Sequence, residues 1–244
     1  MKEQVEKITK FARKVIPCKP CGAVIVAAGS ARRMGGTDKV MTQVLSRPLI
    51  LHAVRAFQET AVIGEIVIVT RPDLIVSISD LCRKAGFDKV NLVVAGGGTR
   101  QESVMLGLGC LSKKMKLAAI HDGARPLVTP QLIDRVVRAA NTYGAAAPGV
   151  PVKDTIKQSR GGIIQSTPDR STLFAAQTPQ VFDRELLRGA LTKAEQEGAA
   201  ITDDCSAVER MGMSVRLVEG DERNFKVTTQ QDLLLARVLM EEGK

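Results

Sequence analysis

Residues 22–35 read Gly-Ala-Val-Ile-Val-Ala-Ala-Gly-Ser-Ala-Arg-Arg-Met-Gly, a short apolar run that stops at a glycine and continues into two arginines. An apolar run of this length between turn signals is typical of a strand buried on both faces, as in a parallel sheet. Gly29 lets the backbone turn sharply and approach a ligand closely. Backbone amides followed by Arg32 and Arg33, with Lys39 a few residues on, suit a polyphosphate. We therefore expect a phosphate-binding loop after the first strand.

Bulk properties favour a protein that binds small phosphorylated ligands. Of the 244 residues, 44% are hydrophobic and 25% are charged, which fits one soluble α/β domain. The formal charge of +9 favours anionic partners, but the single Tyr, the absence of Trp and the lack of a Lys/Arg block argue against nucleic acid. No apolar run approaches the roughly 20 residues of a membrane helix. We expect a cytoplasmic protein with neither a membrane nor a nucleic-acid partner.

The N-terminal segment differs from the rest of the chain. Residues 1–16 carry apolar side chains at helical spacing until two prolines end the pattern. We expect an amphipathic extension over residues 1–21, docked on the domain or on a second subunit, and a main domain over 22–244. Cys18 and Cys21 form a single C-x-x-C without a second pair for zinc, and we interpret the pair as a coincidence in a linker.

Short apolar runs alternate with helical patterns after this extension, which predicts βαβ units and a mostly parallel central sheet. Thr99, Thr129 and Thr229 stand where side chains cap helix starts, so the boundaries of three helices are signalled chemically. The expected strands are residues 23–28, 66–70, 92–95, 117–120, 145–150 and 214–218.

Residues 152–176 break this rhythm. They contain two short β-like pieces, at 154–157 and 163–166, with a Gly-Gly pair between them. A hairpin of this kind buries little by itself, and closed two-fold dimers are the commonest oligomers. We expect a projecting β-hairpin arm that pairs with another subunit.

Three polar clusters each follow a predicted parallel strand: the loop at Gly29, residues 96–103 and residues 121–126. Ligands of open α/β sheets bind outside the carboxyl ends of the strands, so all three clusters would line one crevice. In the second cluster a glycine run leads into a helix, and we expect its free amides to meet an anion or a base edge, with Arg100 and Ser103 adding specificity.

Asp122 ends an apolar strand, where a carboxylate is costly unless it is solvated, paired or bound to a metal. Mg²⁺ at a polyphosphate takes only one or two carboxylates, which makes Asp122 the metal candidate; an Asp122–Arg125 pair that stabilises the turn is the alternative. We interpret His121 as a packing or supporting residue and His52 as structural. Cations, amides and one carboxylate, without a nucleophile motif, favour direct in-line transfer at phosphorus.

Seven motifs carry a family resemblance. In chain order they are Ala-Ala-Gly-x-x-x-Arg-Met (27–34), Gly-Gly-x-x-Arg-Gln-x-Ser-Val (96–104), His-Asp-x-Ala-Arg-Pro (121–126), Pro-Val-x-Asp-Thr-x-Lys (151–157), Gln-Thr-Pro-Gln-x-Phe (177–182), Thr-Asp-Asp (202–204) and Asn-Phe-Lys-Val-Thr (224–228). Together they resemble the 2-C-methyl-D-erythritol 4-phosphate cytidylyltransferases of the non-mevalonate isoprenoid pathway. Seven ordered motifs are far more specific than one.

The resemblance implies a Rossmann-like nucleotidyltransferase that uses CTP and Mg²⁺, joins CMP to methylerythritol phosphate and releases pyrophosphate. It also implies a homodimer in which each arm reaches the neighbouring subunit's site. By motif position, the nucleotide would be held by Ala27, Ala28, Gly29, Gly96, Ser103 and Asp122, with Asp122 also serving the metal. The catalytic cations would be Arg33, Lys39 and Lys226. From the arm, the residues that contact methylerythritol phosphate would be Thr155 and Arg170.

Other functions remain open at this point. A ribitol-5-phosphate cytidylyltransferase would share the fold and the nucleotide, although the motifs at 27–34, 121–126 and 202–204 favour the isoprenoid enzyme. A nicotinamide-dependent dehydrogenase would need G-x-G-x-x-G, which the loop after the first strand lacks. A non-catalytic nucleotide- or nucleic-acid-binding protein would release no pyrophosphate, and nucleic-acid affinity would fall steeply with salt.

Overall fold

The computed structural model describes residues 17–29 and 39–242. The expected N-terminal helix, Arg32 and Arg33 lie outside the described residues. In chain order the elements are β1 (Cys21–Val26), β2 (Gln43–Val44), β3 (Arg47–Pro48), α2 (Leu49–Glu59), β4 (Ile63–Thr70), the 3-10 turn η2 (Pro72–Leu74), α3 (Ile75–Lys84), β5 (Val90–Ala95), α4 (Arg100–Cys110), β6 (Leu117–Asp122), α5 (Pro130–Tyr143), β7 (Ala145–Pro151), β8 (Gln158–Arg160), β9 (Ile163–Ser166), η3 (Arg170–Thr172), β10 (Phe174–Ala176), β11 (Gln180–Asp183), α6 (Arg184–Gln196), α7 (Asp204–Arg210), β12 (Arg216–Glu219) and α8 (Gln230–Glu242).

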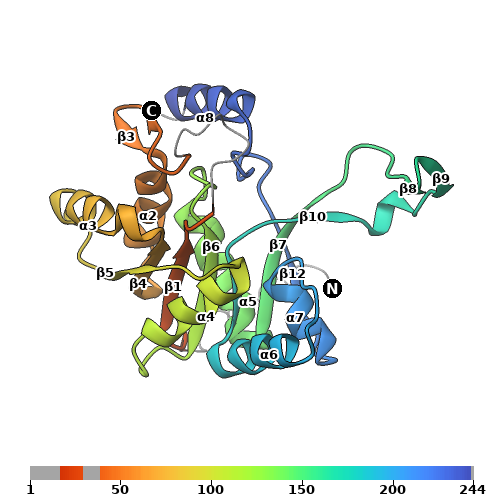
Figure 1. Cartoon of the computed structure of the whole chain (residues 1–244), viewed down its shortest axis with the longest axis horizontal. Coiled ribbons are helices and arrows are strands. Elements are labelled where there is room, and N and C mark those ends of the chain that lie inside the picture. Colours follow the sequence, from red (N-terminus) through yellow and green to blue (C-terminus); the bar gives the residue numbers. More distant parts are fainter. Residues whose placement is uncertain (1–16, 30–38, 243–244) are drawn as a thin grey trace, which may run out of the picture.

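The strand β1 lies inside a mixed, mostly parallel sheet (Figure 1). It pairs in parallel with β4 on one side and with β6 on the other. The strand order is β10-β7-β11-β6-β1-β4-β5, and β12 also pairs with β7. The β4–β5 and β7–β12 pairs are parallel, whereas β11 and β10 run antiparallel to their neighbours. The expected α/β fold is confirmed, and each expected strand in this sheet is present with small shifts at its ends.

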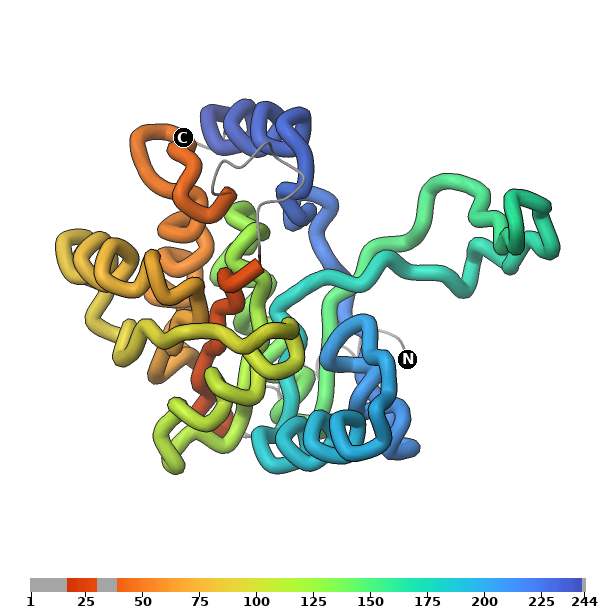
Figure 2. The backbone as a smooth tube through the Cα atoms, in the orientation of Figure 1, coloured from red at the N-terminus to blue at the C-terminus, as the bar shows by residue number. Residues whose placement is uncertain are grey.

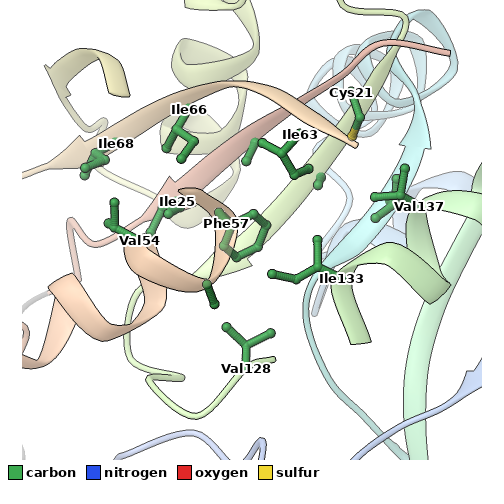
Figure 3. Close-up of a cluster of buried hydrophobic side chains, with 14 of the residues drawn as sticks. Cys21, Ile25, Val54, Phe57, Ile63, Ile66, Ile68, Val128, Ile133 and Val137 are labelled. Carbon is green, nitrogen blue, oxygen red and sulfur yellow. The ribbon is translucent and has the colours of Figure 1, made fainter. Parts of the chain in front are cut away.

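Both faces of β1 are covered, which explains its continuous apolar sequence. Ala23 and Ile25 belong to a core cluster with Phe57 of α2 and with side chains of α3 and α5 (Figure 3). Val24 points to the opposite layer, where it packs with Leu108 of α4 and with side chains of α6 and α7. Alternate residues of a strand face opposite sides, so a strand between two helical layers needs apolar side chains at every position.

The chain between β7 and β10 leaves the body as an arm, seen in green and turquoise at the right of Figure 2. Its hairpin pairs β8 with β9, so the prediction of a strand at 154–157 is wrong and the strand lies at Gln158–Arg160. Gly161 and Gly162 have φ of 59° and 79°, the conformation of a two-residue hairpin turn. Pairing starts directly at that turn, which places the first strand next to it. The last residues of the arm, β10, return to the main sheet beside β7.

Several residues singled out in the sequence belong to the core. Cys21 is not in a linker: it is buried in β1, and burial raises the pKa of its thiol. Cys205, which was not singled out in the sequence, is also buried, near the start of α7, and burial raises the pKa of its thiol. His52 lies in α2 and its Nε2 atom hydrogen-bonds the Val44 carbonyl at 2.9 Å, the structural role that was expected. Across residues 17–29 and 39–242, no helix is long and apolar enough to cross a membrane.

Candidate active site

The first and third polar clusters meet at the carboxyl end of the parallel strands. Val26 ends β1 and is paired in register with Asp122, which ends β6. The Gly123 N–H donates to the Val26 carbonyl at 2.8 Å, and the Ala27 N–H donates to the Val69 carbonyl of β4 at 2.7 Å. These bonds fix the backbone that leads into Ala28 and Gly29.

The second cluster touches the first at Ala28 and Gly96. A Cβ atom on Gly96 would lie 2.5 Å from the Cβ of Ala28 and 2.8 Å from the Oγ of Ser103, so only glycine allows this approach. The buried Ser103 hydroxyl accepts from the Gly97 N–H at 3.1 Å and donates to the Thr99 carbonyl at 2.9 Å. Ser103 therefore shapes the glycine loop from within.

The glycine loop is held by its own helix. Thr99 caps α4 by accepting from the Glu102 N–H at 3.1 Å, as the spacing predicted. The Glu102 carboxylate accepts from the Gly98 N–H at 2.8 Å, and the Gly96 N–H donates to the carbonyl of Thr70 at 2.7 Å. The prediction that this run offers free glycine amides is thus wrong, because each of these amides already has an acceptor within the chain.

Asp122 is the centre of a charge network. Its Oδ2 atom lies 2.9 Å from Lys226 Nζ and 3.7 Å from Arg125 Nε, and its Oδ1 atom lies 3.5 Å from Arg100 Nε. Burial by itself would raise the pKa of this carboxyl, but the three cations, Lys226 first, outweigh burial and lower the pKa to about 2. Asp122 is therefore ionised at neutral pH.

Two roles were expected for Asp122, as a metal ligand and as the ion-pair partner of Arg125. The Asp122–Arg125 pair is present, although Lys226 is the nearer cation. Within the part of the chain that the structure describes, no group of three or more His, Cys, Asp and Glu side chains could hold a metal. The described residues therefore do not supply the ligands for a metal held by protein groups alone. A Mg²⁺ ion with one ionised carboxylate, phosphate oxygens and water does fit.

Lys226 lies on the segment between β12 and α8, and its neighbours on both sides are anchored. The carbonyl of Asn224 accepts from Arg125 Nη1 at 2.7 Å, and the Asn224 side chain is fully buried. On the other side, the Val227 N–H donates to the Ala124 carbonyl at 2.9 Å. The loop after β6 therefore positions the Lys226 backbone directly beside Asp122.

His121 packs beside the network, and both of its ring nitrogens are engaged in hydrogen bonds. Its Nδ1 atom hydrogen-bonds the Thr178 hydroxyl at 2.9 Å and its Nε2 atom hydrogen-bonds the Arg125 carbonyl at 3.2 Å. The ring packs on Phe57 with the centroids 4.9 Å apart. Burial lowers the pKa of His121 to about 4, although the Asp122 charge acts in the opposite direction. The predicted packing or supporting role is confirmed.

Sequence reasoning gave no role to Asp204, the first residue of α7. Its carboxylate is fully buried, and Arg100 Nη2 donates to its Oδ2 atom at 2.8 Å. Burial raises the pKa of Asp204, against the opposing charge of Arg100. The Thr-Asp-Asp motif could have indicated this role. Asp203 caps α7, and Asp204, the next residue, becomes buried when the start of α7 packs against the sheet.

The other expected site residues lie on the arm, in the turn before β2 or outside the described residues. Thr155 and Arg170 are exposed on the arm, where Arg170 Nη1 donates to the Lys153 carbonyl at 2.7 Å. Lys39 lies in the turn before β2, and its carbonyl accepts from the Thr42 N–H at 3.3 Å. Arg33 lies outside the described residues. Among the described residues, Lys226 is an expected catalytic cation that contacts Asp122.

Comparisons with known proteins agree on one family. Residues 21–242 match the family model of 2-C-methyl-D-erythritol 4-phosphate cytidylyltransferase, IspD. The chain is 45% identical over 221 residues to the enzyme of that name from Caldanaerobacter subterraneus subsp. tengcongensis, covering 89% of this chain and 97% of the relative.

Solved structures give the same result. The chain resembles the crystal structure of 4-diphosphocytidyl-2C-methyl-D-erythritol synthase from Anaerococcus prevotii with a TM-score of 0.83 and 28% identity, over 92% of this chain and 100% of that one. It also resembles 2-C-methyl-D-erythritol 4-phosphate cytidylyltransferase from Thermus thermophilus, with a TM-score of 0.74 and 33% identity over 89% and 98%.

Proposed function

The chain belongs to the 2-C-methyl-D-erythritol 4-phosphate cytidylyltransferase family, and we propose that the network around Asp122 is the centre of its active site. The enzyme transfers CMP from CTP to 2-C-methyl-D-erythritol 4-phosphate, giving 4-diphosphocytidyl-2-C-methyl-D-erythritol and pyrophosphate. A phosphate oxygen of the second substrate attacks the α-phosphorus in line, the bond to the bridging oxygen breaks, and pyrophosphate takes the electron pair. Positioning and charge neutralisation supply the catalysis.

The nucleotide is assigned to the carboxyl end of the parallel strands, where the first two clusters meet. Gly96 approaches Ala28 so closely that a Cβ atom on Gly96 would lie 2.5 Å from the Ala28 Cβ, and a Cβ atom on Gly29 would meet no described atom within 4 Å. Ser103 holds the loop whose backbone would meet the cytosine edge. The small side chains and the fixed backbone support a flat base at this position.

Three cations are assigned to the phosphates. Lys226 would neutralise charge on the α-phosphate, and its 2.9 Å contact with Asp122 is the single observation that carries this assignment. Asp122 holds the ammonium group where the parallel strands end, ready to exchange a carboxylate for a phosphate oxygen. Arg33 and Lys39 would bind the triphosphate and stabilise the pentacoordinate transition state.

Mg²⁺ is the implied cofactor, and Asp122 is the residue that would hold it. The Asp122 pKa of about 2 keeps the carboxylate ionised, and the triphosphate would provide further oxygen ligands. When bound, the ion neutralises phosphate charge. Because CTP and the second substrate are charged molecules that do not cross membranes unaided, the proposed location is the cytoplasm.

A homodimer through the arm would complete the site. Exposed apolar side chains on the arm support an interface: Ile156, Ile163, Ile164 and Phe174. A two-stranded hairpin is marginal alone, so a second copy that covers these side chains is a physical reason for the arm to exist. Thr155 and Arg170 would then contact methylerythritol phosphate in the partner's site. The proposed organisation is a catalytic domain over residues 22–244, with the arm at 152–176 and an extension at 1–21.

A pyrophosphate-release assay tests the function. Purified protein with CTP, Mg²⁺ and methylerythritol phosphate is expected to release pyrophosphate, and omission of either substrate should abolish the signal. Ribitol 5-phosphate is the matched substrate control, and it is expected to react much more slowly. Equal turnover of the two sugar phosphates would contradict the assignment of the second substrate. A calorimetric titration that shows no heat of CTP binding would contradict the assignment of the nucleotide site.

A further inference from the structure

Arg100 joins two helices at the edge of the proposed nucleotide site. It is the first residue of α4 and directly follows the glycine loop at 96–99. Its guanidinium group reaches Asp204, the first residue of α7, which lies 104 positions away in the sequence. The start of α4, and with it the end of the glycine loop, is therefore tied to a separate part of the chain.

The start of α7 is itself fixed to the central sheet. Gln180 of β11 accepts with Oε1 from the N–H groups of Asp204 at 3.1 Å and Cys205 at 3.2 Å. Its Nε2 atom donates to Asp203 Oδ2 at 2.7 Å. Asp203 also caps α7, since its Oδ1 atom accepts from the Ser206 N–H at 2.9 Å. Asp204 thus stands on a rigid support that is continuous with the strand beside β6.

The Arg100 side chain is shared unequally between two carboxylates. It lies 2.8 Å from Asp204 and 3.5 Å from Asp122. Within the described chain the Oδ1 atom of Asp204 is buried without a hydrogen-bond partner. A buried carboxylate needs a partner, and Arg100 is the cation that meets it, so this ion pair has a strong preference for one geometry.

We propose that Asp204 is a positioning residue that sets the selectivity for cytosine by holding Arg100, and through it the glycine loop, in place. The inference rests on the proposed function, in which that loop meets the base. Glu102 and Ser103 hold the loop from inside α4, and the Gly96 N–H bond to Thr70 holds the start of the loop to β4, whereas the Arg100–Asp204 pair holds the end of the loop relative to α7 and β11. Hydrogen-bond readout of a base edge depends on the position of the whole loop, so the restraint at the end of the loop helps to set which base fits.

Asp204→Asn is the primary test, because the amide keeps the shape and removes the charge. The ratio of kcat/KM for CTP to kcat/KM for UTP is expected to fall about tenfold, less than the roughly 10²-fold that a full ångström of misplacement costs. KM for CTP should rise by a larger factor than kcat falls, because chemistry at Lys226 is left intact. An unchanged ratio overturns the proposal.

A double-mutant cycle tests whether Asp204 acts through its partner. In an Arg100→Gln background, Asp204→Asn is expected to change the CTP/UTP ratio no further, because the pair is already broken. Independent, multiplicative effects of the two changes would contradict the proposal. Arg100→Lys covers the case in which Asp204→Asn does not fold: it keeps the charge, loses the planar fork and should also lower the ratio.

Glu65→Gln is the matched control. Glu65 is another buried carboxylate, at the other end of the sheet, where it accepts from Asn91 Nδ2 at 3.1 Å and from the Ser112 N–H at 3.2 Å. This change should lower the melting temperature and leave the CTP/UTP ratio as it is. An equal fall of the ratio in Glu65→Gln would show that general destabilisation is the cause and would overturn the proposal.

Calorimetry separates failure of this inference from failure of the proposed function. Dissociation constants of CTP and UTP, measured without the second substrate, should show the same fall in preference for Asp204→Asn. If the wild-type enzyme turns over its substrates and both ratios are unchanged, the positioning role alone is wrong. If the wild type binds CTP but releases no pyrophosphate, the proposed reaction fails, and the binding ratio still decides the role of Asp204.

Discussion

The network around Asp122 and the arm over residues 152–176 are built in opposite ways. Asp122 and Asp204 are buried and held by ion pairs. The backbone at both residues is also fixed to the central sheet, since Gly123 donates to Val26 of β1 and Asp204 donates to Gln180 of β11. On the arm, Ile163 and Ile164 are 68% and 59% exposed, and β8 and β9 form a separate two-stranded sheet. One chain thus preorganises the proposed nucleotide half of the site, whereas the arm carries the proposed substrate residues on a surface suited to a second chain.

The two regions should therefore respond differently to the same kind of change. Removing one member of a buried ion pair leaves an uncompensated buried charge, which typically lowers the free energy of unfolding by about 3–5 kcal/mol. Removing an exposed side chain costs little within one chain, typically within about 0.5 kcal/mol. Changes in the body should thus act on chemistry and folding, and changes in the arm should act on assembly and on the partner's site, with little effect on the folding of the single chain.

The largest effect is expected for Lys226→Ala. Loss of the ammonium group that neutralises the α-phosphate should lower kcat by about 10²–10³-fold, with a smaller change in KM for CTP, because the contact strengthens in the transition state. Steady-state pyrophosphate release measures both constants. Lys193→Ala is the control, since Lys193 is exposed on α6 and pairs only loosely with Glu197 at 3.8 Å. If Lys226→Ala raised KM for CTP and left kcat unchanged, Lys226 would contribute to binding alone, which contradicts its proposed role in the transition state.

The next effect concerns acid stability and belongs to the body alone, because the two histidines of the chain are His52 and His121. The pKa of His121 falls from 6.5 to about 4 on burial, so the folded state favours the neutral ring. The resulting stability is fully present above pH 6.5 and is lost as the pH falls toward 4, by about 3 kcal/mol in total. Urea unfolding between pH 7 and pH 4 measures this slope.

Substitution separates the two histidines in that measurement. His121→Asn should remove most of the slope between pH 6.5 and 4, whatever it does to stability at pH 7. His52→Asn is the matched change at a half-buried ring whose pKa is also lowered by burial, and it should remove a smaller part. A full slope in His121→Asn would contradict the buried neutral state of that ring.

The smallest effect on folding is expected for Ile163→Ser on the arm. The unfolding free energy of the single chain should change by less than about 0.5 kcal/mol, because this side chain is mostly exposed. The concentration at which the dimer dissociates should rise, as measured by analytical ultracentrifugation. Single-chain destabilisation above about 1 kcal/mol with an unchanged dimer would show that the arm packs on its own body.

Much of the fold could be predicted because local patterns fix it. The apolar run of β1, with both faces buried, and the caps at Thr99 and Thr129 are readable from neighbouring residues. The strand expected at 154–157 was wrong because the Gly161–Gly162 turn, rather than apolar content, sets where pairing begins. Cys21 was also misassigned, because β1 begins at Cys21, before the apolar run that predicted the strand.

The rest depends on contacts between distant parts of the chain. No local pattern pairs Arg100 with Asp204, and none reveals that Gly96, Gly97 and Gly98 donate their amides within the chain. The sequence motifs indicated Asp122 as a site residue but did not predict which cations surround its carboxylate. Its three cations come from α4, from the loop after β6 and from the segment before α8, which only the folded sheet brings together.

Subunit complementation tests most directly whether the body of one chain and the arm of another form one site. Lys226→Ala and Arg170→Ala are each expected to be nearly inactive alone. When the two are co-expressed, half of the dimers are mixed and each mixed dimer has one intact site of two, so activity should return to about a quarter of the wild-type value. Activity in the mixture no higher than the average of the two variants would contradict the account.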